Sequence, residues 1–381
     1  MTRRSNGEGT EPKWNEKRQC FEGKITLGGK RKTVRGKTRA EYFRNVKAAE
    51  AAYNKGLPVN ASKQTTGDYI LNWMELYGSH NWKPGTIGDH AQSLRLHVLP
   101  QIGHIQLQKI NRDAIQGMVN AWIDDGCASS SIRKYLQPVR GALITAWEDG
   151  KIAKNPMQGV KLPKLKKEEI SFFTRQEAAR YTACLPETSN GRLLAFILRS
   201  GLRRGEAIGL QWQDIGEKSF KVQRTVRHTS KKGGGMELYI NNDGKTDNSI
   251  REIPLNDQLG AILADQRRHQ MQQRLKAGEA WRGAAPGSAR QWIFSNDLGA
   301  CADESNVRRT HDATLKSAGL DGVDIHGLRH TFATLWVERG ANIKNLSAIL
   351  GHADTSITLN RYVHPVRDQM QEEMCVMGAI F

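Results

Sequence analysis

The chain has 381 residues, and 57 Lys and Arg against 39 Asp and Glu give it a net charge of +18. Its composition, 38% hydrophobic and 25% charged, excludes a wholly disordered chain, and its longest apolar run, Leu193 to Leu198, is far shorter than the roughly 20 residues that cross a bilayer. The length predicts two or three domains, and the charge favours a polyanionic partner, either nucleic acid or an anionic membrane surface.

The N-terminus and the cysteines indicate the setting of the protein. Residues 1–14 include basic side chains but no apolar stretch behind them, so we expect no secretory signal and a cytoplasmic protein. The cysteines are scattered singly, with no CxxC pair and no His group at zinc spacing, which predicts neither a disulfide scaffold nor a structural zinc site. They are Cys20, Cys127, Cys184, Cys301 and Cys375.

The first part of the chain is the most basic. Residues 1–60 hold fifteen Lys and Arg against six Glu and no Asp, which accounts for half of the net charge. Two segments rich in β-branched residues, 20–27 and 30–35, are joined by Gly28-Gly29, a turn that tolerates positive φ at both positions. The spacing predicts a small sheet. Because the charges lie on strands and not on an amphipathic helix, DNA is favoured over a membrane.

A helix is predicted to follow this sheet. Thr38 and Glu41 have the spacing of a capping box, and Tyr42 and Val46 begin an apolar stripe on the helix. We therefore predict a basic domain of one sheet and one helix over residues 1–58. The alternative is a solvated, partly disordered tail, because runs of charge often mean only that.

From residue 65 to 155 the pattern is helical throughout. Apolar residues recur at intervals of three and four in two stripes, Tyr69 to Tyr77 and Ile132 to Trp147, which predicts a compact helical bundle. Residues 156–173 lose this periodicity and are rich in Lys, which is typical of a domain linker.

The last region, residues 174–381, is predicted to be mostly helical with one β interruption. It opens with another capping box at residues 174–177. Alternation over 220–226 and β-rich segments at 238–240 and 250–255 then predict a three-stranded antiparallel meander.

Three segments of this last region concentrate Arg, His and Tyr. Arg203 lies on a turn after an apolar helix, where a rigidly held guanidinium can bind two oxygens of one phosphate. His326 and Arg329, three residues apart on a predicted helix, can address one anion. His352 is followed ten residues later by Tyr362. Each segment alone has a plainer explanation: a surface Arg paired with an acid, a solvent-facing pair, and a core Tyr.

Taken together, two arginines, two histidines and a tyrosine in this order resemble the catalytic set of the tyrosine recombinases, the phage-integrase family. The motifs that carry the resemblance are HGLRHTFAT, residues 326–334, and LGHADTSITLNRY, residues 350–362. The resemblance implies a multidomain fold, mainly α with small antiparallel β-sheets. Its expected parts are an arm-type DNA-binding domain (1–58), a helical, SAM-like core-binding domain (65–155), a linker (156–173) and a mixed, mostly helical catalytic domain with a C-terminal tail (174–381).

The resemblance also implies roles for individual residues. The arginines and histidines would hold the scissile phosphate, the tyrosine would attack it, and a lysine on a β-hairpin turn would protonate the leaving 5′ oxygen. A phenol with a pKa of about 10 needs such cations to react at neutral pH. Without a magnesium-binding carboxylate cluster or a P-loop, we expect no metal, ATP or other cofactor. The implied catalytic set is Arg203, Lys245, His326, Arg329, His352 and Tyr362.

The expected partner is double-stranded DNA at core and arm attachment sites, bound by a homo-tetramer in the nucleoid of a bacterial host. An excisionase and a host DNA-bending protein would assist by family analogy. The apolar end of the chain, residues 374–381, would dock on a neighbouring protomer or on its own domain. Candidate DNA contacts are Lys30, Arg31, Lys32, Arg35, Lys164, Lys166 and Lys167.

Two other hypotheses for the function stay open. A chromosome-dimer resolvase or a type IB topoisomerase relative would use the same chemistry, but such resolvases normally lack the basic N-terminal sheet. A sequence-specific DNA-binding protein without catalysis would have no need of a tyrosine ringed by cations. We therefore predict a site-specific recombinase that integrates or excises a phage or another mobile element through a 3′-phosphotyrosyl intermediate.

Overall fold

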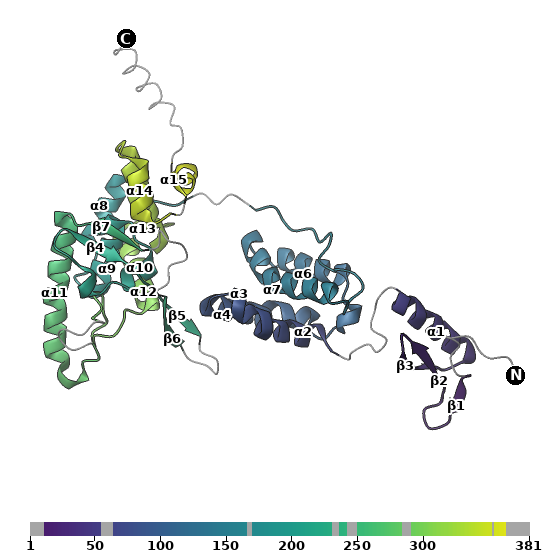
Figure 1. Cartoon of the computed structure of the whole chain (residues 1–381). Helices are drawn as coiled ribbons and strands as arrows, with labels where there is room; N and C mark the ends of the chain where they lie inside the picture. The colour runs from purple at the N-terminus through teal and green to yellow at the C-terminus, as the bar shows by residue number, and fades with distance from the viewer. Residues whose placement is uncertain are drawn as a thin grey trace, which may run out of the picture. The chain divides into compact units, whose positions relative to one another are not determined.

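The computed structural model of the chain divides into two compact units, residues 1–167 and 168–381, each described here by itself (Figure 1). The fold is mainly α with small antiparallel sheets, as predicted. No helix of the described residues is long and apolar enough to cross a membrane. The structure describes residues 11–54, 64–165, 170–230, 236–241, 250–283, 291–352 and 354–362.

The first unit begins with a three-stranded antiparallel sheet in the order β1-β2-β3, formed by Lys13–Asn15, Cys20–Leu27 and Lys30–Gly36. Gly28 and Gly29 link β2 to β3 with φ values of 53° and 76°, which confirms the predicted turn.

Helix α1 (Arg39–Asn54) covers one face of this sheet. It starts where the capping box predicted, because Thr38 Oγ1 accepts the Glu41 N–H at 3.1 Å. The Glu41 carboxylate in turn accepts the Lys37 N–H at 2.8 Å. Sheet and helix enclose a small core of Ile25, Leu27, Val34, Tyr42 and Ala49.

The rest of the first unit is helical, as predicted, and has its own core, to which both apolar stripes and the residues between them, such as Leu94 and Ile115, contribute. Two residues of those stripes lie outside this core: Tyr77 and Trp147 are 45% and 47% exposed. Tyr77 instead stacks on the buried Trp73. The helices are α2 (Thr66–Trp73), α3 (Ser79–Asn81), α4 (Pro84–Ser93), α5 (Leu99–Ile102), α6 (Arg112–Asp124) and α7 (Ser129–Glu148), with π-helical segments Met74–Gly78 and Leu94–Val98 and a 3₁₀ turn Leu107–Lys109.

The second unit is built around the apolar helix α9 (Ser189–Ser200), which packs against α11, α12 and α13. The predicted capping box is confirmed, since Thr174 and Glu177 cap α8 reciprocally. The other helices are α8 (Arg175–Ala183), α10 (Arg204–Ile208), α11 (Asp257–Ala277), α12 (Glu304–Ala318), α13 (Ile325–Glu338), α14 (Ile343–Leu350) and α15 (Thr355–Tyr362), with 3₁₀ turns Trp212–Asp214 and Gly278–Ala280.

The predicted three-stranded meander is wrong, because the strands form two separate ladders. β4 (Ser219–Val222) pairs with β7 (Arg251–Pro254), and β5 (Thr225–Ser230) pairs with β6 (Met236–Asn241).

The break between β4 and β5 has a local cause. Arg224 forms a buried ion pair with Asp214 and also donates to Gly209 O at 3.2 Å, while Gln223 Nε2 donates to Asp214 Oδ1 at 2.6 Å. These two residues therefore turn toward Asp214 and leave the ladder, because a buried carboxylate requires hydrogen-bond donors.

Candidate active site

Arg203 lies at the turn between α9 and α10. Gly201 ends α9 with φ of 66°, and a Cβ there would come within 2.5 Å of the Phe332 ring, so only glycine fits. The Arg203 backbone N–H and its Nη1 donate to the two carboxylate oxygens of Glu206 at 3.0 and 2.8 Å. The guanidinium is 40% exposed, so one side is held by protein and the other is open.

Arg329 is the most deeply buried cation of the site, at 1% exposure. It lies on the first turns of α13, where Asp324 caps the helix by accepting the Gly327 N–H at 2.7 Å. Its Nη1 donates to Gly201 O at 2.9 Å and its Nη2 to Leu350 O at 2.7 Å. These carbonyls are at the C-terminal ends of α9 and α14, where carbonyls lack helical partners and the helix dipole is negative.

Those contacts compensate only part of the cost of burying a charge. Burial and the neighbouring Arg203 lower the pKa of Arg329 to about 9. The side chain is still cationic at pH 7, and its geometry is fixed by two helix ends before any substrate arrives.

His352 follows α14, which ends at Gly351 with φ of 64°. Its Nε2 lies 3.0 Å from Arg329 Nη2, and because a guanidinium only donates, this nitrogen accepts. The ring proton is therefore on Nδ1, which donates to Thr358 Oγ1 at 2.8 Å. Burial and Arg329 lower the pKa of His352 to about 4, so the ring is neutral at pH 7.

Two further histidines lie one turn apart on α13. The His326 and His330 rings meet edge to face with centroids 4.6 Å apart. The His326 ring lies at the surface, and its partial desolvation, followed by the charge of Arg329, lowers its pKa. His330 is buried, and burial together with His326 lowers its pKa to about 4.

Tyr362 is buried at 7% exposure, and its ring packs with Ala333, Leu346 and Leu350. Its hydroxyl lies 2.7 Å from His330 Nδ1. Burial raises the pKa of the phenol, while the cations around it, with Arg329 foremost, act in the opposite direction.

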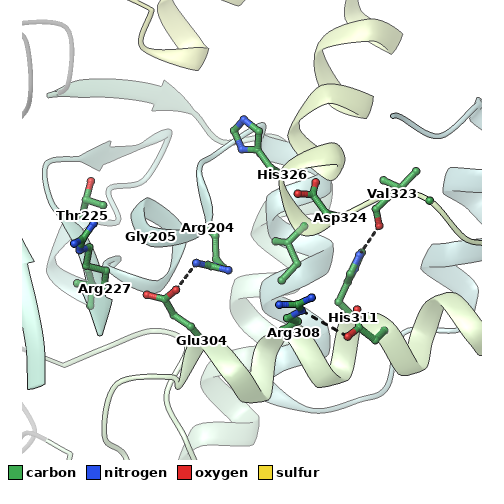
Figure 2. Close-up of a pocket in the computed structure, with 14 residues that line it drawn as sticks. Arg204, Gly205, Thr225, Arg227, Glu304, Arg308, His311, Val323, Asp324 and His326 are labelled. Atoms are coloured by element: carbon green, nitrogen blue, oxygen red, sulfur yellow. Dashed lines mark hydrogen bonds and ion pairs between the residues drawn. The ribbon is translucent and has the colours of Figure 1, made fainter. Parts of the chain in front are cut away.

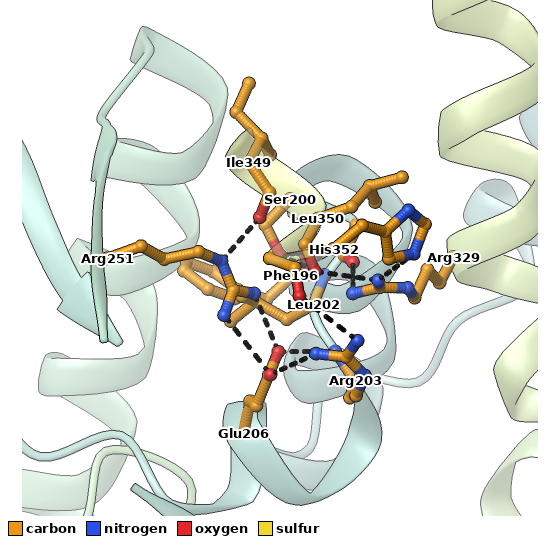
Figure 3. A network of polar contacts seen from close by, with 12 residues as sticks. Phe196, Ser200, Leu202, Arg203, Glu206, Arg251, Arg329, Ile349, Leu350 and His352 are labelled. Atoms are coloured by element: carbon orange, nitrogen blue, oxygen red, sulfur yellow. Dashed lines mark hydrogen bonds and ion pairs between the residues drawn. The ribbon is translucent and has the colours of Figure 1, made fainter. Parts of the chain in front are cut away.

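A network of ion pairs links Arg203 to residues that lie deeper in the protein (Figure 3). Arg251, on β7, donates from Nη1 and Nη2 to Glu206 Oε1 and Oε2 at 3.2 and 2.8 Å and from Nε to Ile349 O at 2.6 Å. Glu206 thus joins Arg203 to Arg251. Burial alone would raise the pKa of Glu206, but the hydrogen bonds and charge of Arg251 outweigh it and lower that pKa to about 2.

A polar cavity of about 720 Å³ opens beside His326 (Figure 2). Arg204 and Arg308 line it, each paired with an acid: Arg204 with Glu304, and Arg308 with Asp312 at 3.8 Å. Opposite charges balance within the cavity, so it is polar without being strongly cationic.

The structure brings together five of the six predicted catalytic residues: Arg203, His326, Arg329, His352 and Tyr362. Lys245, the sixth, lies outside the described residues, as do the predicted DNA contacts Lys166 and Lys167 and the C-terminal segment 374–381. In the described part of the chain, no three His, Cys, Asp or Glu side chains are grouped so as to hold a metal ion.

The predicted DNA contacts that are described all lie in the first unit. Lys164 is exposed. In β3, side chains alternate between the two faces of the sheet, and Val34 packs toward α1. Arg31 and Arg35 therefore lie on the face away from α1, whereas Lys30 and Lys32 share the side of Val34.

Sequence reasoning missed three residues of the site: Arg251, His330 and Thr358. His330 and Thr358 lie inside the two motifs that carried the resemblance, but no role was drawn for them. Arg251 carried no signal beyond the strand in which it lies, because its partners Glu206 and Ile349 are distant in sequence.

The site therefore combines a buried guanidinium held at two helix ends, neutral histidines and a buried tyrosine. It lies within a region of the chain that matches a known family. The model described as the phage integrase family matches residues 171–369, and that of the phage integrase N-terminal SAM-like domain matches residues 65–123. The chain belongs to the phage integrase family: it is a tyrosine-type site-specific DNA recombinase of the integrase class.

Individual relatives match nearly the whole chain. The chain is 29% identical to a protein named tyrosine recombinase XerC-like from Caldanaerobacter subterraneus, over 92% of each, and 27% identical to an integrase of Streptomyces ambofaciens, over 100% of this chain and 98% of the relative.

Two solved structures have a similar fold. The Tn1549 transposon integrase in complex with transposon right end DNA has a TM-score of 0.65 at 21% identity, covering 83% of this chain and 100% of that one. A lambda integrase tetramer bound to a Holliday junction has a TM-score of 0.60 at 17% identity, covering 96% and 98%. These likenesses confirm the predicted fold.

Proposed function

We propose that this recombinase cleaves double-stranded DNA by attack of the Tyr362 hydroxyl on a phosphate held by Arg203 and Arg329, which leaves a 3′-phosphotyrosyl bond. One observation carries the proposal. The buried guanidinium of Arg329 contacts His352, and Tyr362 is held by the residue next to Arg329. Neighbouring residues of α13 thus supply the buried arginine of the proposed cradle and hold the proposed nucleophile, which lies on α15.

The chemistry follows from the charges. Attack on the phosphate builds negative charge on its non-bridging oxygens, and fixed guanidinium groups stabilise that charge without a metal. His326 and His352 complete the cradle in this proposal, His352 by the tautomer with its proton on Nε2, which donates to the phosphate while Nδ1 accepts from Thr358 Oγ1. The cations around Tyr362 favour its phenolate, so the phenolic proton is released to water as the P–O bond forms. The leaving 5′ oxygen takes up a proton as its bond to phosphorus breaks, for which we propose Lys245, because a lysine near other cations has a lowered pKa. The phosphotyrosyl bond conserves the energy of the broken phosphodiester, so rejoining needs no ATP.

We assign the parts of the chain as arm-type DNA-binding domain (1–58), core-binding domain (65–155), linker (156–173) and catalytic domain (174–381). Separate cores in the sheet domain and in the bundle support this division. In the first domain we propose Arg31 and Arg35 as the main arm contacts, with Lys30 and Lys32 secondary. Lys164, Lys166 and Lys167 would contact backbone phosphates near the core site.

The assembly that we propose is a homo-tetramer on two DNA sites, since a lambda integrase of similar fold forms a tetramer on a Holliday junction. The apolar end, residues 374–381, would dock on the next protomer. A directionality factor and a host DNA-bending protein would set the direction of the reaction. The protein would act in the cytoplasm of a bacterial host, at the nucleoid, where its substrate is.

A covalent adduct tests the function directly. Full-length protein is mixed with nicked duplexes from the DNA that flanks its gene, so that cleavage is trapped, and protein-linked DNA is detected after denaturation in SDS. We expect an adduct for the wild type and none for Tyr362→Phe. Tight, specific binding without any adduct would instead favour a non-catalytic DNA-binding protein, and an adduct in Tyr362→Phe would mean that another residue attacks.

A further inference from the structure

Helix α15 is held by histidines at two points on one face. Thr358 and Tyr362 are four residues apart, so they lie on the same side of the helix, and both are buried, at 0% and 7% exposure. His352 contacts Thr358 at 2.8 Å and His330 contacts Tyr362 at 2.7 Å. Two contacts on one face fix the rotation of the helix about its axis, and therefore the direction of the phenol.

His330 is itself rigidly placed. It follows Arg329 directly on α13, and it is buried at 8% exposure. The next residue, Thr331, accepts the Phe173 N–H at 2.9 Å and donates to Gly327 O at 2.8 Å, which anchors the same turn of the helix. The distance between the His330 ring and the Arg329 guanidinium is therefore set by one well-packed turn.

The protonation states decide what this contact does. His330 is neutral at pH 7, because burial and the nearby His326, Arg361 and Arg329 lower its pKa to about 4. Burial raises the pKa of Tyr362, so the phenol is also neutral. A neutral imidazole with its proton on Nε2 has a lone pair on Nδ1, to which a neutral phenol can donate. A ring with so low a pKa is a weak base, so the contact orients the phenol and does not deprotonate it.

We propose that His330 is a positioning residue of the recombination reaction: its Nδ1 accepts a hydrogen bond from the Tyr362 hydroxyl and holds the phenol oxygen beside Arg329, where the phosphate arrives. This inference rests on the proposed role of Tyr362 as the nucleophile. It gives a function to a histidine that the phosphate cradle does not use.

Two variants of the full-length protein separate the hydrogen bond from the bulk of the ring. His330→Leu removes the acceptor at similar volume, and His330→Asn keeps an oxygen near the position of Nδ1. With nicked duplexes under single-turnover conditions, we expect His330→Leu to form the adduct about 10- to 100-fold more slowly, since small misplacements of reacting groups have effects of that size. His330→Asn should recover most of the rate, and the DNA affinity of both should match the wild type.

The control is His269→Leu, the same change on α11, which carries none of the residues of the site; it should cleave like the wild type. If His330→Leu does not fold, His330→Ala with and without added imidazole replaces it, and imidazole should restore the rate. A wild-type rate in His330→Leu, equal losses in the Leu and Asn variants, or no rescue by imidazole overturns the inference.

Adduct formation by the wild type shows whether this inference or the proposed function has failed. If the wild type forms an adduct that depends on Tyr362 and His330→Leu forms it equally fast, only the role of His330 fails. If the wild type forms no adduct, the proposed function fails and the role of His330 with it.

Discussion

The two cationic regions of the chain hold their charges in opposite ways. On the N-terminal sheet, Lys30, Arg31 and Arg35 are exposed. In the second unit Arg329 is buried and fixed by two backbone carbonyls, and Arg251 is buried against Glu206. Exposed charges are screened by salt and cost little to place, whereas buried charges shift pKa values and depend on exact partners. The first region is thus suited to affinity and the second to reactivity.

Arg329→Lys tests the buried side of this contrast with the largest expected effect. An ammonium group lacks the planar fork by which Nη1 and Nη2 separately reach Gly201 O and Leu350 O, so it cannot keep the same geometry toward a phosphate. We therefore expect adduct formation to fall by about 10²- to 10³-fold. The rate is measured with nicked duplexes under single turnover. Arg268→Lys, an exposed arginine on α11, is the matched control and should keep the wild-type rate. Near-normal cleavage by Arg329→Lys would show that charge alone suffices.

Glu206→Gln tests the network behind the cradle. It leaves the buried Arg251 without a counter-charge, so we expect the free energy of unfolding to fall by about 3–5 kcal/mol in urea denaturation. Asp265→Asn, which breaks an exposed ion pair with Arg268, should change it by less than about 0.5 kcal/mol. If the two variants lowered the free energy of unfolding equally, the buried ion pair would contribute no more to stability than the exposed one.

The buried histidines make stability depend on pH. The ordinary pKa of histidine is 6.5, and in the folded chain those of His330 and His352 are about 4. Between these values the unfolded chain binds protons that the folded chain does not, so stability falls as pH falls from about 6.5 to 4. We expect the free energy of unfolding to decrease by about 2 kcal/mol from pH 7 to pH 5, allowing for the partial exposure of His352.

Denaturant titrations at both pH values check this. His330→Asn removes one of the histidines whose pKa is lowered in the folded chain, so its stability should vary less with pH than that of the wild type. An unchanged slope would mean that His330 does not titrate as its burial implies.

The same contrast explains what could be predicted from the sequence. The Gly28-Gly29 turn and the caps at Thr38 and Thr174 depend on neighbours within a few residues, so local patterns predicted them. His326, Arg329, His352 and Tyr362 could be proposed for the site because they lie in two compact motifs of a known family.

Two of the pairings that the sequence did not predict join residues over long separations. Arg251 and Glu206 are 45 residues apart and His330 and Tyr362 are 32 apart. Nothing in a local pattern distinguishes such a partner from an ordinary polar residue. The predicted meander failed for a different reason: the break at Arg224 depends on its ion pair with Asp214, a residue outside the strands that strand alternation does not take into account.

Arg31→Ala tests the exposed charges of the N-terminal sheet and has the smallest expected effect. Arg31 lies on the face of the sheet away from α1, and each phosphate contact contributes about one unit to the slope of log Kd against log salt. We expect Arg31→Ala to weaken binding of the full-length protein to duplex DNA less than about tenfold and to reduce that slope by about one. Binding is measured by fluorescence anisotropy at several salt concentrations.

Lys30→Ala is the matched control, because it removes the same charge from the neighbouring residue on the opposite face. Long-range attraction depends on net charge and so would fall equally in both variants, whereas a direct phosphate contact is lost only where the side chain faces the DNA. A larger change of slope for Arg31→Ala therefore assigns the open face of the sheet to the duplex. Equal changes would mean that the sheet attracts DNA by its total charge, and a larger change for Lys30→Ala would assign the edge beside α1 instead.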